Sequence, residues 1–529
     1  MKRIVFLTSS GLAILFFILY MSILSHILYY HEQHRLFLFS EAYLINTVNS
    51  RGLLEYFTDF MIQFFYFPWL GSLLLSLLLA SVYGMIAYST FRITGKTDFL
   101  HFGLLPVIYL FLQTLSVDYK ISSIVAWIFS LSIISMAVGL SAGRWKYVAA
   151  VSGCLLLLTF ISWETVVLAA ASISLSSLSA YYFRSLKKKR VLTVGFSAMS
   201  VYVCAGIYCF SGSYRVGERY MVLARKSAYE RNWNKTAEMT EHYLSSGHKN
   251  IVMLYYHNIA LFHTGRLGDN LLDIPQTFGV PALCFPWRSN SRDTEFGQDV
   301  YYELGHWNAA VRWASEALAI WGETAPCLIN LIKCNMEIKR EAVARRYVNV
   351  LKQSLFYRKT AEYFEKELAS IRDEPVADNV QIAHFTNGMD ILHELEYLCE
   401  HHPENRMAFE YYMVSLLLSN QVLNFAQNLY RMKAFDYRKM PKVYDEALFM
   451  CKIMEKEEFD KLGIDVNPKT EDRFKRYYEL YKQGNRKGLD REFKNSYWYY
   501  IHFVSPYGDK ILMWKNTKES QMPLGGLEH

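Results

Sequence analysis

The hydrophobic pattern divides the chain near Phe210. Before this residue apolar runs follow one another with short polar breaks, and after it apolar and charged residues alternate at helical spacing. A helix that crosses a bilayer needs about 20 apolar residues. Seven runs reach or approach that length, and we predict spans near 4–28, 61–90, 99–116, 121–142, 147–162, 165–183 and 191–211. The fifth run is short and turns tightly into the sixth, so a re-entrant hairpin is the alternative for that pair. The pattern predicts an all-α protein whose first domain, residues 1–212, is a polytopic membrane domain.

The loop between the first two predicted spans, residues 29–60, is not a polar linker. Apolar side chains recur at helical spacing on both sides of the break "NTVNSRG", and they are Leu36, Phe39, Tyr43 and Leu44 before it and Leu53, Tyr56, Phe57 and Phe60 after it. Such a pattern is typical of two short amphipathic helices that lie along a membrane surface.

The second half, residues 213–524, reads as paired amphipathic helices. In "YYELGHWNAAVRWASEALAI", Gly305 is expected to allow a close helix approach, and Trp307 and Ala310 are expected to pack; Trp233 and Ala237 repeat the idea. These units resemble tetratricopeptide repeats, which have a period of 34 residues. We therefore predict a TPR-like α-solenoid, whose concave face is expected to bind a protein or peptide. The final "GGLEH", residues 525–529, looks like a cloning scar.

Charge predicts the orientation of the membrane domain. With the amino terminus in the cytoplasm, eleven of its 14 Lys and Arg residues fall on the cytoplasmic side, as the positive-inside rule requires. Seven spans then place residues 213–524 outside, in the periplasm if the cell is a Gram-negative bacterium, with the chain in the inner membrane. The net charge of +7 comes entirely from the membrane domain, so nucleic-acid binding receives no support.

Carboxylates gather on the predicted outer side. Six of the seven acidic residues of the membrane domain lie there, and Glu32, Asp118 and Glu164 lie at or near span ends. Ionisable groups at such depth usually face a protein-lined cavity and mark a functional site; the alternative is that acids simply decorate outward loops. The stretch "HEQHR", residues 31–35, is not the zinc motif H-E-x-x-H, because its second histidine comes one position early.

Two resemblances follow from these features. The seven-span domain, its outer loop of two helices, the acidic residue after the first span and the Pro-x-x-Gly break in "YFTDFMIQFFYFPWLGSLLLSLLLA" resemble the GT-C superfamily of polyprenol-dependent glycosyltransferases. The stretch from His31 to Gly71 together with the repeat-like second half is similar to a Bacteroidota family of multi-span proteins with helical-repeat periplasmic domains, a likeness that brings no activity with it. The chain departs from the superfamily's frequent Asp-containing signature, because Glu32 stands there between histidines.

The GT-C resemblance implies transfer of a sugar from a polyprenyl-phosphate-type lipid to a periplasmic acceptor that the solenoid presents. It implies Glu32 as the catalytic base, with Asp118 and Glu164 orienting the acceptor or holding a divalent cation such as Mg²⁺ or Mn²⁺. The departing phosphate of the lipid donor needs positive charge or donors. The candidates on the outer side are Arg35, Lys120, Arg215, Arg219, His31 and His34.

A non-enzymatic scaffold is the main alternative. In that interpretation the spans anchor a TPR-like domain that gathers envelope proteins, and the outer carboxylates are dispensable. A transporter is weaker, because no predicted span carries a charge near its centre and no inverted repeat is visible.

Overall fold

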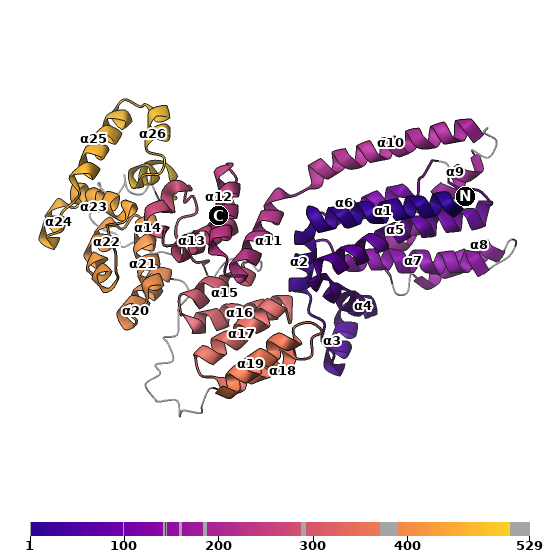
Figure 1. The fold of residues 1–529 in the computed structure, drawn as a ribbon, viewed down its shortest axis with the longest axis horizontal. Coiled ribbons are helices and arrows are strands. Elements are labelled where there is room, and N and C mark those ends of the chain that lie inside the picture. Colours follow the sequence, from indigo (N-terminus) through magenta and orange to yellow (C-terminus); the bar gives the residue numbers. More distant parts are fainter. Residues whose placement is uncertain are drawn as a thin grey trace. The chain divides into compact units, whose positions relative to one another are not determined.

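The described part of the chain is helical throughout. In the computed structural model it forms 27 α-helices and short 3₁₀ and π turns; it contains no β-strand and one isolated β-bridge (Figure 1). The predicted all-α class is thus confirmed. The structure describes residues 2–98, 100–140, 143, 145–157, 161–182, 188–286, 293–370 and 390–507. The suspected cloning scar lies outside these residues.

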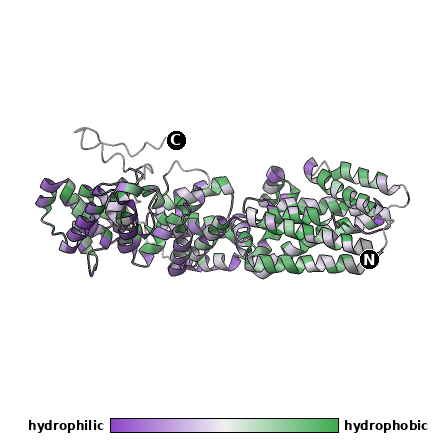
Figure 2. Ribbon diagram, turned by 90° about the horizontal axis from the view of Figure 1, so that it is seen from above, coloured by the Kyte–Doolittle hydropathy of each residue, from purple (hydrophilic) through white to green (hydrophobic). Residues whose placement is uncertain are grey.

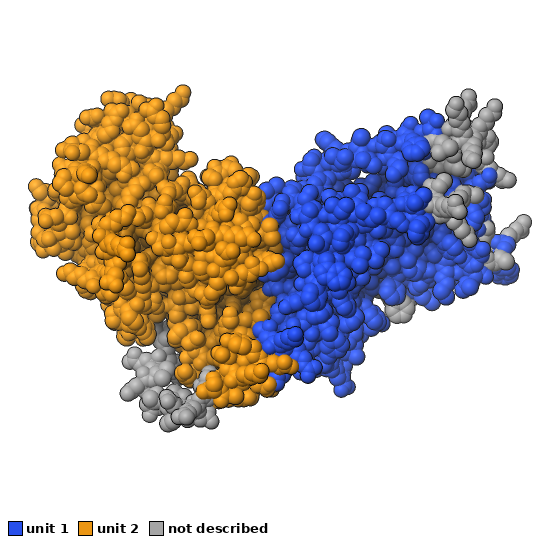
Figure 3. Space-filling model, in the orientation of Figure 1, with its two compact units in different colours: residues 1–219, 350–361 blue, residues 220–349, 362–529 orange. Residues whose placement is uncertain are grey.

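Two compact units make up the protein (Figure 3). Unit 1 comprises residues 1–219 together with a distant segment, residues 350–361, and unit 2 comprises residues 220–349 and 362–529. The sequence pattern predicted a single boundary near residue 212 and gave no sign that the 350–361 segment belongs with the amino-terminal unit. Apolar residues dominate the helices of unit 1, whereas polar and apolar residues mix in unit 2 (Figure 2).

Unit 1 contains five helical stretches long and apolar enough to cross a membrane, within the residues described. They are Val5–Ser22, Pro68–Thr94, Ile121–Leu140, Trp163–Tyr182 and Thr193–Ser213. Two other predicted spans coincide with shorter apolar helices, α6 and α8. The helices of unit 1 are α1 (Lys2–Ser22), α2 (Ser25–His34), α3 (Glu41–Arg51), α4 (Leu53–Ile62), η1 (Gln63–Tyr66), α5 (Pro68–Thr94), α6 (Leu104–Gln113), α7 (Ile121–Leu140), α8 (Trp145–Leu157), α9 (Trp163–Tyr182) and α10 (Lys188–Ser213).

Helices α5, α7 and α9 pack together and run in the same direction. At one end Ser122, at the start of α7, donates to Glu55 on α4 at 2.7 Å. At the other end Arg92 of α5 donates to the carbonyl of Gly139 on α7, and Ser179 of α9 donates to Asp98, which follows α5, at 2.9 Å. Because consecutive long helices are parallel, the chain returns along the unit between them, through α6 and then through α8.

The predicted Pro-x-x-Gly break has a steric basis. Pro68 begins α5, where its missing N–H costs no hydrogen bond. A Cβ atom on Gly71 would lie 2.9 Å from the Cα of Phe65, so only glycine lets η1 turn back against the first turn of α5. The two short helices predicted within residues 29–60 are α3 and α4, which Gly52 separates with a φ of 93°.

Unit 2 holds the remaining helices. They are α11 (Val216–Tyr229, which starts in unit 1), α12 (Trp233–Ser245), α13 (Ile251–His263), α14 (Leu267–Asn270), η3 (Leu271–Asp273), η4 (Val280–Ala282), α15 (Thr294–Glu303), α16 (Trp307–Trp321), α17 (Ala325–Glu337), α18 (Glu341–Leu351), α19 (Arg358–Ser370), α20 (Ile391–His401), α21 (Arg406–Leu418), α22 (Val422–Asn428), η5 (Leu429–Ala434), α23 (Lys442–Met454), α24 (Lys456–Leu462), α25 (Pro468–Lys482), α26 (Arg486–Glu492), α27 (Tyr497–Tyr499) and η6 (Tyr500–Val504). Consecutive helices pack as antiparallel pairs around buried side chains such as Ala237 and Ala310.

One turn geometry recurs six times between paired helices of unit 2. In each turn a residue with positive φ donates its N–H to the carbonyl three positions back, and the next residue donates to the carbonyl five positions back, as in a Schellman motif. The positive-φ residues are Arg231, Gly265, Gly305, Lys339, Asn420 and Gly484. The first two lie 34 residues apart, as do the next two. A Cβ on Gly305 would meet nothing nearer than 3.6 Å, so this glycine supplies a turn conformation rather than the close helix approach that we expected.

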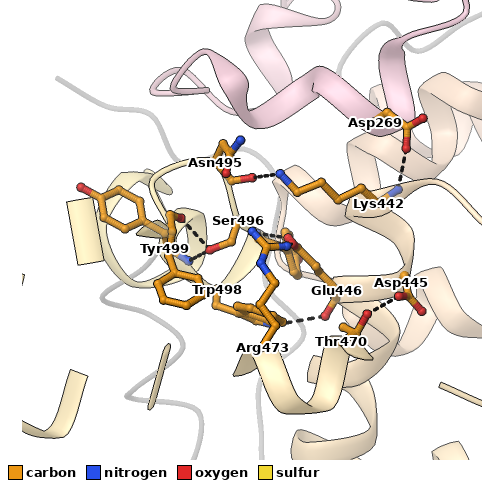
Figure 4. A network of polar contacts seen from close by, with 12 residues as sticks. Asp269, Lys442, Asp445, Glu446, Thr470, Arg473, Asn495, Ser496, Trp498 and Tyr499 are labelled. Atoms are coloured by element: carbon orange, nitrogen blue, oxygen red, sulfur yellow. Dashed lines mark hydrogen bonds and ion pairs between the residues drawn. The ribbon is translucent and has the colours of Figure 1, made fainter. Parts of the chain in front are cut away.

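A buried carboxylate fastens the carboxy-terminal helices of unit 2 (Figure 4). Glu446 on α23 is 1% exposed and forms an ion pair with Arg473 on α25. Its Oε2 accepts the N–H of Tyr497 at 2.7 Å, and its backbone carbonyl accepts the indole N–H of Trp498 at 3.3 Å. Burial raises the pKa of Glu446, and the positive charge of Arg473 opposes that rise.

Glycine at a non-glycine turn should stabilise the protein. Lys339 is exposed and has a φ of 58°, a conformation that costs a residue with a side chain about 1 kcal/mol. We expect Lys339→Gly to raise the free energy of unfolding by about 0.5–1 kcal/mol, measured by thermal unfolding of the chain in detergent with circular dichroism. The same substitution at Lys366, an exposed position inside α19, should lower it by about 1 kcal/mol. Equal effects at both positions would contradict this account of the turn.

Removing the Glu446 carboxylate should destabilise unit 2. Glu446→Ala leaves the Arg473 guanidinium and the Tyr497 N–H without their acceptor, and breaking such a buried pair costs about 3 kcal/mol. The matched control is Glu479→Ala, which removes an exposed carboxylate 3.7 Å from Arg476 and should cost less than about 1 kcal/mol. Similar melting temperatures for the two variants would show that the network contributes little.

Candidate functional site

The collar, residues 31–35, is the end of α2 and the residue that follows it. Helix α2 starts after a break at Ile23 and Leu24, where both N–H groups donate to the carbonyl of Leu19. The break turns the polar residues of α2 toward protein: His31 is 7% exposed and Glu32 is 4% exposed. The other three collar residues, Gln33, His34 and Arg35, are half-buried.

Glu32 is held by two donors in the buried centre of this site. The hydroxyl of Tyr357 donates to Oε1 at 2.5 Å. The side-chain amide of Gln33 donates to Oε2 at 2.5 Å and to the Tyr357 hydroxyl at 2.9 Å. Burial raises the pKa of Tyr357, and the adjacent Glu32 carboxylate raises it further, so Tyr357 remains a protonated donor.

The 350–361 segment reaches this site as an extended strap rather than as a helix. Ser354 forms the isolated β-bridge with Leu38, and the N–H of Phe39 donates to the carbonyl of Gln353 at 2.9 Å. The ring of Phe356 stacks on that of Tyr66, with centroids 5.3 Å apart. Backbone pairing, ring stacking and the Tyr357 hydroxyl together fix this segment to unit 1.

Sequence analysis missed Tyr357. It lies in "QSLFYR" between α18 and α19, two helices with strong polar faces. A pair of aromatic residues in such a connection was the available signal, because a short loop between exposed helices has little reason to carry them.

A second buried carboxylate lies beside the collar. Asp59 on α4 is 1% exposed; it pairs with Arg51 at 2.8 Å and accepts the hydroxyl of Tyr43 at 2.8 Å. Burial raises the pKa of Asp59, and the charge of Arg51 opposes the rise. The amide of Gln63 donates to the carbonyls of Arg35, at 2.7 Å, and Asp59, at 3.0 Å, which joins the collar to α4.

His31 is a neutral imidazole in this environment. Burial lowers its pKa to about 3, and the nearby charges of His34 and Arg35 act in the same direction. Its Nε2 is buried without a hydrogen-bond partner in the described structure. His34 differs, because its Nδ1 lies 2.8 Å from the carbonyl of Tyr30 and its ring stacks on Tyr30.

The other predicted site residues lie in different surroundings. Asp118, Lys120 and Glu164 are exposed, whereas Glu32 is buried. Arg215 pairs with Glu218 at 2.8 Å, and Arg219 donates to the hydroxyl of Tyr214 at 3.4 Å. The structure therefore brings together His31, Glu32, His34 and Arg35 on one helix end. Within the described residues no group of three His, Cys, Asp or Glu side chains is placed to hold a metal ion.

Large apolar side chains surround the collar on the outside of unit 1. Phe39, Phe57, Tyr66, Phe67 and Trp69 are each between 40% and 56% exposed. Exposed aromatic residues at the end of an apolar helix bundle are typical of the membrane–water interface. The collar thus lies at the level that lipid headgroups would occupy if the long helices cross a bilayer.

Comparison with known proteins gives one match. A family model described as a family of unknown function, DUF6057, matches residues 1–504. No curated protein and no solved structure matches the chain.

Loss of the Tyr357 hydroxyl should release the strap. Tyr357→Phe keeps the ring but removes a buried hydrogen bond to a carboxylate, which contributes about 1.5–3 kcal/mol. We expect hydrogen exchange of the 350–361 segment, measured by mass spectrometry on the full chain in detergent, to accelerate by about 10- to 100-fold. Tyr363→Phe, at a position 56% exposed, should leave this exchange unchanged. Unchanged exchange in Tyr357→Phe would show that the hydroxyl does not hold the segment.

Proposed function

We propose, since the chain belongs to the DUF6057 family and that family carries no function, that the protein is a membrane-anchored scaffold whose unit 2 binds other proteins. The observation that carries the proposal is the recurrence of one Schellman turn at six positions, twice with a separation of 34 residues. This is the period of tetratricopeptide repeats, so it supports a degenerate TPR-like solenoid. Solenoids of this kind bind proteins and peptides along an extended face.

The packing of unit 1 supports seven membrane crossings. Parallel α5, α7 and α9 require the chain to return twice, and α6 and α8 with their flanking residues provide those passages. An odd number of crossings and the positive-inside distribution place unit 2 on the non-cytoplasmic side. In a Gram-negative cell that side is the periplasm, and the membrane is the inner membrane.

One face of unit 2 is continuous across four repeat units. The helices that precede the first four turns are α11, α13, α15 and α17, and each contributes a side chain to a polar row centred on Asp299. Its carboxylate accepts Tyr256 at 2.7 Å and Tyr229 and Asn330 at 3.4 Å each. Tyr229 is 36% exposed and Lys333 is half-buried beside it on the same row. We assign partner binding to this face.

A glycosyltransferase is the second candidate, and two observations favour it. A buried acid, Glu32, follows the first long helix, and two short helices, α3 and α4, separate the first two spans, as the GT-C resemblance implies. In this alternative Glu32 acts as the base toward a polyprenyl-phosphate-linked sugar, with Asp118 and Glu164 in supporting roles. Because Tyr357 and Gln33 occupy both oxygens of Glu32, catalysis would require the 350–361 segment to withdraw.

Photo-cross-linking in the producing cell tests the scaffold. A benzoylphenylalanine residue in place of Tyr229 should give a discrete adduct with another protein, because this side chain lies on the polar row. The same residue in place of Tyr363, an exposed position on α19, is the matched control and should give no such adduct. An identical pattern of adducts at both positions would contradict partner binding on this face.

Glu32→Gln separates the two candidate functions. The amide keeps the size of the side chain and loses the base, so a transferase should lose at least about 100-fold in activity. The comparison is by mass spectrometry of envelope glycans and lipid-linked sugars in a deletion strain and in strains that express the wild type or Glu32→Gln. The scaffold predicts that Glu32→Gln retains the Tyr229 adduct and gives the wild-type glycan profile. A profile that matches the deletion strain and differs from the wild type favours the transferase.

A further inference from the structure

The collar carries positive charge that the protein does not neutralise. The guanidinium of Arg35 is half-buried, and the structure places no described carboxylate within ion-pair distance of it. Asp59, the nearest acid that influences its surroundings, already pairs with Arg51 and accepts Tyr43. A cation that is partly removed from water without a counter-ion is costly, so an anion from outside the chain is expected there.

His31 supplies a second unsatisfied group at the same place. It is more than nine-tenths buried, and its Nε2 has no hydrogen-bond partner among the described residues. Residues 31 and 35 are one helical turn apart, so their side chains lie on the same face of the helix end. The carbonyl end of α2 also favours positive charge, which helps to keep Arg35 in position.

We propose that His31 and Arg35 bind the phosphate group of a membrane lipid at the collar. A guanidinium donates two parallel hydrogen bonds to phosphate oxygens, and the Nε2–H tautomer of a neutral imidazole donates a third. The exposed aromatic residues around the collar, such as Tyr66 and Trp69, would contact the acyl chains below the headgroup. The inference stands apart from both candidate functions, because a scaffold and a transferase can each hold such a lipid.

The remaining cations of the outer side fit this role less well. Lys120 is exposed to solvent, where water satisfies its ammonium group, and Arg215 already pairs with Glu218. The proposal therefore singles out two of the six phosphate-binding candidates of the sequence analysis, together with an environment that only the structure reveals.

Native mass spectrometry of the full-length chain in detergent tests the site. The probes are dioleoyl phosphatidic acid, dioleoylglycerol, which lacks the phosphate, and inorganic phosphate. We expect the chain to retain one phosphatidic acid molecule and to bind dioleoylglycerol at least about tenfold more weakly. Arg35→Gln should weaken phosphatidic acid binding by about tenfold or more, the loss typical of one charge-assisted contact, and Arg35→Lys should recover part of it.

Controls decide whether the effect belongs to the collar. Lys120→Gln removes one positive charge from the same side of unit 1 and should leave lipid binding unchanged. His31→Phe keeps the bulk of the ring and should weaken binding several-fold, which provides a second variant if Arg35→Gln does not fold by circular dichroism. Wild-type binding in both Arg35→Gln and His31→Phe, or an equal loss in Lys120→Gln, would overturn the site. Inorganic phosphate that binds as tightly as phosphatidic acid, with the same dependence on Arg35, would overturn the lipid as its source.

Discussion

The hydrogen bond from Tyr357 to Glu32 is the interaction on which the arrangement of unit 1 depends. A buried carboxylate is tolerated only when donors satisfy it, and one of the two donors with a known distance comes from 325 residues further along the chain. The bond brings an extended segment into a helical unit, and the β-bridge at Ser354 and the stacking of Phe356 follow from that placement. Unit 1 is therefore complete only with a piece of the chain that lies between two helices of the second half.

The sequence predicted the periodic parts of this protein well. Long apolar runs gave the all-α class and the five long helices, and the alternation around Gly52 gave α3 and α4, because periodicity records which face of a helix is buried. It did not predict the joining of Glu32 to Tyr357. A single long-range contact leaves no period, and the acidic residues near span ends looked equivalent although Glu32 is buried while Asp118 and Glu164 are exposed.

The repeats of unit 2 show a similar division. The tryptophans that suggested repeats, Trp233 and Trp307, follow turns of identical geometry, but three of the six turns place arginine, lysine or asparagine at positive φ instead of glycine. Sequence periodicity fades when such positions vary, whereas the hydrogen-bond pattern of the backbone persists. Arg231 and Lys339 thus keep a 34-residue spacing that residue identity alone conceals.

A disulfide between the bridged positions tests most directly whether the 350–361 segment belongs to unit 1. Leu38→Cys combined with Ser354→Cys places two thiols across the β-bridge, and the parent chain with its own cysteines is the control. Mild oxidation of the full-length chain in its membrane should form an intramolecular disulfide, detected by mass spectrometry of the linked peptides. Two cysteines that react with a thiol reagent but do not form this link would contradict the placement of the segment, and with it the role assigned to Glu32.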